Sequence, residues 1–185
     1  MPSKGQKITD KFTGDTIEFI ETSADTNGER VSLKATLKSK GQTVDDHIHL
    51  LQDESYETLS GRMTYFLNGE QHHVSAGEKV VLQKNKAHNH YNMDDIPAEY
   101  IQTITPGMDI DLFVENLFGM INDGKVKGGK LPFLQAMVTA KYLDSQSRLA
   151  AIPPGLQNVL INIIAPIARL FGYRAIYKKY TGVEK

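Results

Sequence analysis

Three histidines and one glutamate near the middle of the chain could together bind a metal ion. His47 and His49 are two residues apart, Glu54 follows five residues after His49, and His88 lies on a later segment. If residues 47–49 form a strand, both imidazoles lie on one face, because side chains alternate along a strand. Imidazole and carboxylate ligands suit divalent transition metals such as Fe, Mn, Zn, Ni or Cu. The chain has no cysteine, so thiolate ligands and disulfides are excluded.

The segments that carry these residues are predicted to be short strands. Residues 31–37 alternate between apolar and polar side chains, which is typical of a half-buried strand. Asn68 and Gly69 separate two β-rich runs and predict a hairpin. Further strands are expected at Thr16–Glu21, Val44–Leu51, Tyr56–Leu59, Val80–Leu82, Ala87–Tyr91 and Tyr100–Thr105. Many short strands at roughly even spacing favour one antiparallel β-domain, which we place over residues 1–107.

The hydrophobic period becomes helical after Gly107, so residues 108–185 are predicted to be a helical extension. A first helix runs from Ile110 to Ile121, and Pro132 can open a second helix. A third run extends from Leu156 to Phe171, and Pro166 is expected to kink or divide it. We expect this extension to pack on the β-domain or to lie in a dimer interface.

The third helical run has a wide apolar stripe, and several Lys and Arg residues lie within it or follow it in the sequence. Its stripe consists of Leu156, Val159, Leu160, Ile163, Ile164, Ile167 and Phe171, while Ile161 lies off it. Such a stripe needs cover from the β-domain, from the other helices or from a second subunit, which predicts a homodimer. From Gly155 onward the chain has five Lys and Arg residues against one acid, so an interfacial membrane helix is an alternative. The run is too short and too polar for a transmembrane span.

Composition narrows the function classes. The chain has 185 residues, 40% of them apolar, which allows one soluble domain with a substantial core. Its formal net charge of -1 argues against a general nucleic-acid binder. Residues 1–6 lack the apolar segment of a secretory signal, so a cytoplasmic location is expected.

The central stretch resembles the first motif of the cupin superfamily. Gly41 is followed after five residues by His47, then by His49 after one, Glu54 after four and Gly61 after six. The second cupin motif aligns on Gly77, His88 and Asn92, with Gln83 and Asn85 where proline and glycine are usual. Asparagine tolerates the left-handed region better than most residues, so a tight turn at Asn85 is still expected.

The resemblance covers roughly residues 30–105 and implies an antiparallel jelly-roll β-barrel with a metal inside. Carried over by position, the metal ligands would be His47, His49, Glu54 and His88. By strand alternation His90 shares the face of His88 and Tyr56 that of Glu54, so both are candidates for lining the cavity beside the metal.

Two functions follow from this resemblance. The first is a metal-dependent enzyme that acts on a small organic molecule, of the oxygenase or isomerase type. The alternative is a non-catalytic module that binds or senses a small molecule. The sequence has no glycine-rich GxGxxG phosphate loop and no nucleophile triad pattern, so it does not name the reaction.

Overall fold

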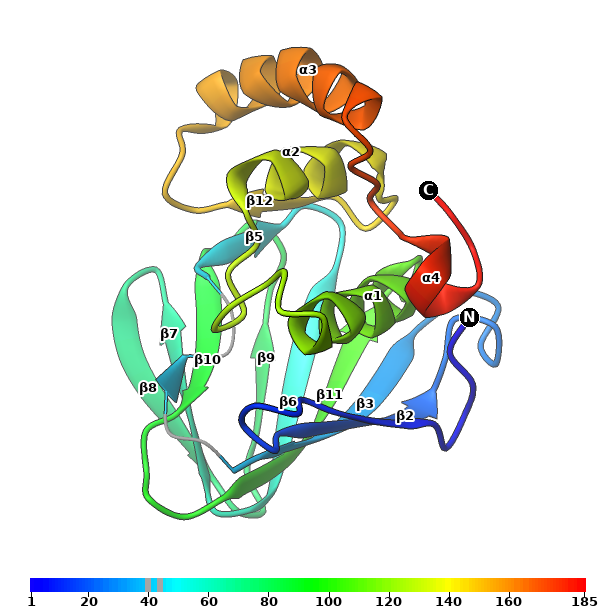
Figure 1. Cartoon of the computed structure of the whole chain (residues 1–185). Helices are drawn as coiled ribbons and strands as arrows, with labels where there is room; N and C mark the ends of the chain where they lie inside the picture. The colour runs from blue at the N-terminus through cyan, green and yellow to red at the C-terminus, as the bar shows by residue number, and fades with distance from the viewer. Residues whose placement is uncertain (39–40, 43–44) are drawn as a thin grey trace.

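Two antiparallel β-sheets face each other as a jelly-roll barrel, and helices follow on one end and side of it (Figure 1). The computed structural model describes residues 1–38, 41–42 and 45–185. One sheet has the strand order β1-β2-β3-β11-β6-β9, and the other has the order β12-β5-β10-β7-β8, with β4 paired to β10. The strands are β1 (Lys7–Thr9), β2 (Thr16–Glu21), β3 (Val31–Leu37), β4 (Gly41–Gln42), β5 (His47–His49), β6 (Asp53–Ser60), β7 (Arg62–Leu67), β8 (Glu70–Ser75), β9 (Lys79–Leu82), β10 (His88–Asn92), β11 (Ala98–Thr105) and β12 (Ser147–Leu149).

The strands largely follow the pattern expected from the sequence. β2 has the predicted bounds and β3 covers the predicted run of alternation up to Leu37, and β7 and β8 form the predicted hairpin, with Asn68 and Gly69 at positive φ values of 52° and 85°. The strand expected over Val44–Leu51 is shorter, because only His47–His49 pair with neighbours; Val44 lies outside the described residues. The predicted mainly β jelly roll with a C-terminal helical region is therefore confirmed.

Strand alternation builds the barrel core. The side chains of Phe19, Leu33, Tyr56, Met63 and Tyr100 are essentially inaccessible to solvent and belong to one apolar cluster between the sheets. Along β3 every second side chain from Val31 to Leu37 is buried in this cluster. Burial of such apolar surface is the main force that holds the two sheets together.

The helices form a second region that contacts the barrel through α1 and β12. Their bounds are α1 (Ile110–Asn122), α2 (Phe133–Tyr142), α3 (Pro154–Leu170) and α4 (Lys178–Thr181). In Figure 1, α2 and α3 stack beyond the end of the barrel that carries β5 and β12, and α1 lies between that layer and the first sheet. Phe113 of α1 packs against both the barrel cluster and the helical cluster. The three longer helices appear where the sequence predicts them.

Two features of the helical region differ from expectation. α3 continues through Pro166 as one helix, so the possible division at this proline was wrong. The short strand β12 was not predicted: it leaves the helical layer and pairs with β5, placing Ser147 opposite His49 and Leu149 opposite His47. A three-residue strand carries too little periodic signal to be recognised in a sequence.

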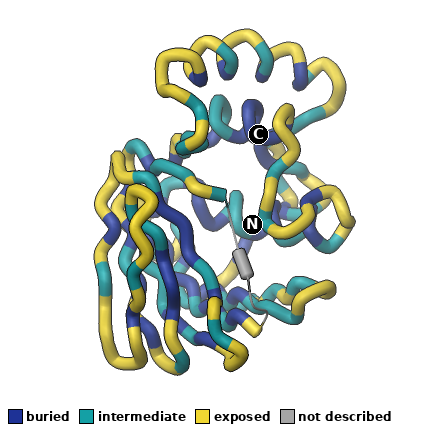
Figure 2. The backbone as a smooth tube through the Cα atoms, turned by 90° about the vertical axis from the view of Figure 1, so that its left-hand side faces the viewer, coloured by how far each residue is buried: buried dark blue, intermediate teal, exposed yellow. Residues whose placement is uncertain are grey.

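The apolar stripe of α3 packs inward only at its edge, through Leu160 and Ile164. Ile161, which lies off the stripe, is 3% exposed, whereas Ile163 of the stripe is 58% exposed. Figure 2 shows α3 as an arc whose outer side is exposed and whose inner side is buried. The expected cover by a second subunit stays a prediction, as does the membrane alternative. No described helix is both long enough and apolar enough to cross a membrane.

Candidate metal centre

The four predicted ligands come together inside the barrel. Their ligand atoms, contributed by His47, His49, Glu54 and His88, all lie within 4.8 Å of one another. The Nε2 atom of His49 is 2.9 Å from Oε1 of Glu54, and the Nε2 atom of His88 is 3.2 Å from Oε2 of the same carboxylate. Two ligands on opposite sides of an ion at about 2.1 Å would be about 4.2 Å apart. The four ligand atoms are therefore close enough together to contact one ion.

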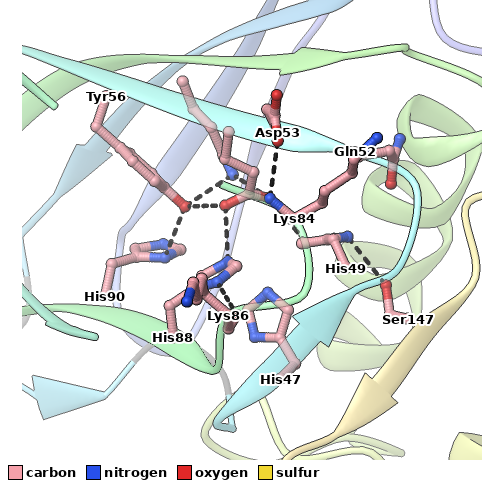
Figure 3. A network of polar contacts seen from close by, with 12 residues as sticks. His47, His49, Gln52, Asp53, Tyr56, Lys84, Lys86, His88, His90 and Ser147 are labelled. Carbon is pink, nitrogen blue, oxygen red and sulfur yellow. Dashed lines mark hydrogen bonds and ion pairs between the residues drawn. The ribbon is translucent and has the colours of Figure 1, made fainter. Parts of the chain in front are cut away.

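Three strands position these side chains. His47 and His49 leave β5 on the same face, as alternation requires, and Figure 3 shows both rings beside His88 of β10. Antiparallel pairing places His88 directly opposite His47. The turn before β10 has Asn85 at φ 63°, the left-handed conformation expected for it, and the Asn85 backbone N–H donates to the carbonyl of His49 over 2.8 Å. This contact ties the two sequence motifs together.

Each histidine of the cluster has a partner for its outer nitrogen. His47 Nδ1 is 2.8 Å from the backbone carbonyl of Asp45, and His88 Nδ1 is 2.9 Å from that of Lys86. A carbonyl only accepts, so both Nδ1 atoms carry a proton, and a metal would be bound through the Nε2 atoms. His49 Nδ1 is 3.2 Å from the hydroxyl of Ser147, which can accept in the same way. Such partners orient metal-binding imidazoles and set their tautomers.

The polar atoms at the centre fit a cation. His49 Nε2 is buried and makes no hydrogen bond within the described residues, although Oε1 of Glu54 is 2.9 Å away, because the geometry is not that of a hydrogen bond. With its proton on Nδ1, the Nε2 lone pair faces the carboxylate lone pairs. Such an arrangement is stabilised by a proton or a metal ion placed between them. The residues present therefore fit a divalent metal.

The pKa values of the clustered side chains determine which of them are charged when a cation binds. Burial lowers the pKa of His47 to about 3, helped by the neighbouring His49 and His88, so this ring is neutral at neutral pH. Burial alone would raise the pKa of Glu54, but the adjacent His49 and His88 keep it well below its ordinary value. Burial opposes protonation of His88, yet its contact with Glu54 raises the pKa of that imidazole. The raised pKa of His88 favours a proton on Nε2, 3.2 Å from Oε2 of Glu54, and a metal ion bound at the cluster would displace that proton.

A hydrogen-bond network holds the carboxylate from behind. The hydroxyl of Tyr56 donates to Oε2 of Glu54 over 2.6 Å and lies 3.3 Å from Nδ1 of His90. The Nε2 amide of Gln102 donates to both the Tyr56 hydroxyl (3.1 Å) and Oε1 of Glu54 (3.3 Å). Figure 3 shows Tyr56, His90 and His88 side by side on this face of the site. The structure thus brings both candidate neighbours of the metal, His90 and Tyr56, to the cluster.

Two residues of this site were missed in the sequence, Gln102 and Ser147. Gln102 lies on β11, where its inward position follows from pairing with Tyr56 of β6. Ser147 comes from β12 in the helical region. Neither residue type is a metal-site signal by itself, and the pairing of distant strands cannot be read from spacing. Their roles depend on tertiary contacts.

The remaining motif residues shape the backbone. Gly61 has φ 68°, and a Cβ atom there would lie 2.5 Å from the carbonyl oxygen of Pro97, so only glycine fits this turn. The side-chain amide of Asn92 donates to the backbone carbonyls of Leu37 on β3 and of the nearby Ile96. Gly61 and Asn92 therefore fix backbone turns next to the strands that carry the cluster.

Comparisons with known proteins found one family model and several solved structures of low sequence identity. The model of the cupin domain family matches residues 34–104. A sugar phosphate isomerase from a cupin superfamily of Silicibacter pomeroyi DSS-3 is 14% identical, with 56% of this chain and 75% of that chain covered and a TM-score of 0.47. KdgF from Halomonas sp. is 15% identical, with 60% and 99% covered and a TM-score of 0.49. No curated protein sequence matches the chain significantly.

The matched segment contains the four clustered residues and most strands of both sheets. Residues 34–104 thus match the cupin domain family, and a helical region follows them. The matched segment carries a His/Glu cluster that could hold a metal, and the matched family does not identify the ion.

Proposed function

We propose that this protein is a metal-dependent enzyme that acts on a small organic molecule. The observation that carries the proposal is the convergence of three oriented imidazoles and one carboxylate at a cavity. The cavity has a volume of about 390 Å³, and His47, His49, Glu54 and His90 line it. A cluster that faces a cavity of this size can hold an ion and present it to a ligand.

The protein residues have separable roles in this proposal. His47, His49, Glu54 and His88 would hold the ion, which when bound polarises a substrate oxygen or activates a small molecule for oxygenase- or isomerase-type chemistry. Tyr56 and Gln102 orient the carboxylate through their hydrogen bonds. Burial lowers the pKa of His90 to about 4, so this ring is neutral at neutral pH. A neutral imidazole beside the cavity can accept a proton from a bound substrate.

Metal analysis of the natively purified protein tests the proposal. We expect close to one equivalent of a transition metal, and loss of that metal in His47→Ala and in His88→Ala. His72→Ala is the matched control, because its imidazole lies on the β7–β8 hairpin with 40% of its side chain exposed. Retention of the metal in both site variants would refute the ligand assignment.

Turnover separates the enzyme from a binding module. Loss of ligand turnover in His47→Ala, with turnover retained in His72→Ala, would support catalysis at the metal. Stoichiometric metal and measurable ligand affinity without turnover would instead favour a module that binds or senses a small molecule.

A further inference from the structure

The cavity at the candidate metal centre continues out of the barrel and beneath the helices. At one end it is lined by His47, His49 and Glu54. Beyond them its walls come from strands of the first sheet and from α1 and α2. Figure 1 shows why these elements can share one cavity: α1 and α2 lie next to the end of the barrel that carries β5. The helical region therefore shapes the space that a molecule at the site would occupy.

The walls away from the histidines are mainly apolar. Ile17, Leu33 and Ile104 contribute from the barrel, and Phe113, Val114 and Ala140 contribute from the helices. These residues expose no hydrogen-bonding side-chain atoms to a ligand. A polyhydroxylated molecule in contact with these six side chains would lose its hydrogen bonds to water without replacing them.

The described walls also lack the charges that a phosphate group requires. Arg148 is the one lysine or arginine among the described lining residues, and its Nη1 atom already donates to the backbone carbonyls of Ala140 and Ser147. Three acids, Asp10, Asp15 and Asp45, also line the cavity. Phosphate sites usually combine several cationic or backbone N–H donors, and neighbouring carboxylates oppose them.

We propose that the ligand of this site is a mainly apolar molecule with one oxygen-bearing end. The oxygen end, a carboxylate, carbonyl or hydroxyl, faces the His/Glu cluster, and the apolar body lies between the barrel and helices α1 and α2. This inference rests on the proposed function for the role of the metal end, whereas the apolar end rests on the cavity walls alone.

Calorimetric titration of the metal-loaded protein with a homologous series tests the proposal. Acetate and decanoate share a carboxylate head group and differ in apolar length. Decanol replaces the carboxylate with a hydroxyl and so tests the head group. Glucose 6-phosphate is the polar, phosphorylated alternative. Each buried methylene contributes roughly fourfold in affinity, so decanoate is expected to bind at least about 100-fold more tightly than acetate. Decanoate binding no tighter than acetate, or tighter binding of glucose 6-phosphate, would overturn the substrate class.

Variants with larger side chains on the cavity wall test whether the ligand binds in this cavity. Ala140→Phe adds a ring from α2, and Val114→Phe adds one from α1; each is expected to weaken decanoate binding about tenfold or more while metal content stays unchanged. Ala151→Phe makes the same alanine change at an exposed position outside the cavity and should leave binding unchanged. Unchanged decanoate affinity in both folded cavity variants would show that the molecule binds elsewhere.

The two proposals fail in different ways. A protein that holds stoichiometric metal but does not prefer decanoate contradicts the substrate class and leaves the metal-dependent function standing. A protein that binds decanoate in this cavity, with the same affinity in His47→Ala and without any metal, supports the apolar cavity and contradicts the metal-dependent function.

Discussion

The barrel and the helical region contribute to the same site by different means. The barrel supplies all four candidate metal ligands from β5, β6 and β10, where strand alternation and antiparallel pairing set their directions. The helical region supplies Ser147 behind His49 and the apolar walls of α1 and α2. In the functions proposed above, the barrel would therefore hold the metal, whereas the helices would shape the space for the ligand.

The largest expected effect is on the free energy of unfolding, and it tests whether the barrel and the helical region unfold as one unit. Leu33 in the barrel core and Met137 in the helical core are both 0% exposed. Leu33→Ala and Met137→Ala should each lower the free energy of unfolding by about 2–5 kcal/mol. Because Phe113 packs on both cores, we expect one transition, shifted by either variant, when urea unfolding is followed by circular dichroism and tyrosine fluorescence. Two separate transitions, with only one shifted by each variant, would show that the regions are independent.

The second-largest expected effect is a loss of metal affinity when the one anionic ligand of the cluster, Glu54, is neutralised. Glu54→Gln keeps the size of the side chain but replaces the carboxylate with a neutral amide. Loss of a partner outside the metal ligands costs about 10–100-fold in affinity, so we expect a loss of more than 100-fold here. Competition with a chelator of known affinity measures it, and Glu57→Gln is the control because that side chain is exposed on the same strand. Equal affinities in the two variants would contradict a role for Glu54.

The stability that Asp109 contributes at the junction between the barrel and the helical region should depend on pH. Asp109 precedes α1 and accepts from the backbone N–H groups of Asp144 (2.8 Å) and Ser145 (2.9 Å) and from the Lys185 ammonium (2.6 Å). Burial alone would raise the pKa of Asp109, but the Lys185 ammonium and the two backbone donors lower it below its ordinary value. Its ionised form therefore stabilises the fold above about pH 4, and this stability is lost as the pH falls through the lowered pKa.

Asp109→Asn should consequently lower the free energy of unfolding by about 1.5 kcal/mol at pH 7. The difference from the wild type should shrink at pH 2–3, and urea unfolding at several pH values measures it. Asp144→Asn is the control: its carboxylate also contacts Lys185 at 2.6 Å, but 70% of its side chain is exposed, so little change is expected. A pH-independent difference would indicate a purely steric role for Asp109.

The smallest expected effect tests the contribution of the helical region to the metal end. Ser147→Ala removes the partner of His49 Nδ1 and should weaken metal binding about tenfold, because the imidazole loses its fixed orientation. Thermal unfolding of the metal-free protein should be almost unchanged. Ser60→Ala, at an exposed position of β6, is the matched control. Unchanged metal affinity in Ser147→Ala would leave the barrel as the sole support of the ligands.

Local patterns in the sequence predicted much of the barrel and the candidate ligand set. Alternation in Val31–Leu37, the Asn68-Gly69 turn and the helical period after Gly107 all correspond to the observed elements. The His47-x-His49 spacing requires only a strand to align two imidazoles. Such features depend on backbone geometry over a few residues, which is why they can be recognised without a structure.

Features set by contacts between distant segments could not be predicted. The stripe of α3 showed which side chains are apolar, but the helix buries an adjacent side, centred on Ile161 and Ala165, and only Leu160 and Ile164 of the stripe pack against the helical core. Small residues such as Ala165 allow close helix packing there, whereas the wide stripe stays exposed in the single chain. The direction in which a helix faces depends on the neighbours that its loops bring to it.

The sequence by itself determined that a strand presents His47 and His49 together, that Glu54 and His88 stand at matching spacing, and that helices follow the barrel. Only the tertiary structure decided that Gln102 and Ser147 support the site and that α1 and α2 complete an apolar cavity beside it. The physical reason is the range of the interactions. Side-chain direction along a strand is a local property, whereas a cavity wall is made of surfaces that only folding brings together.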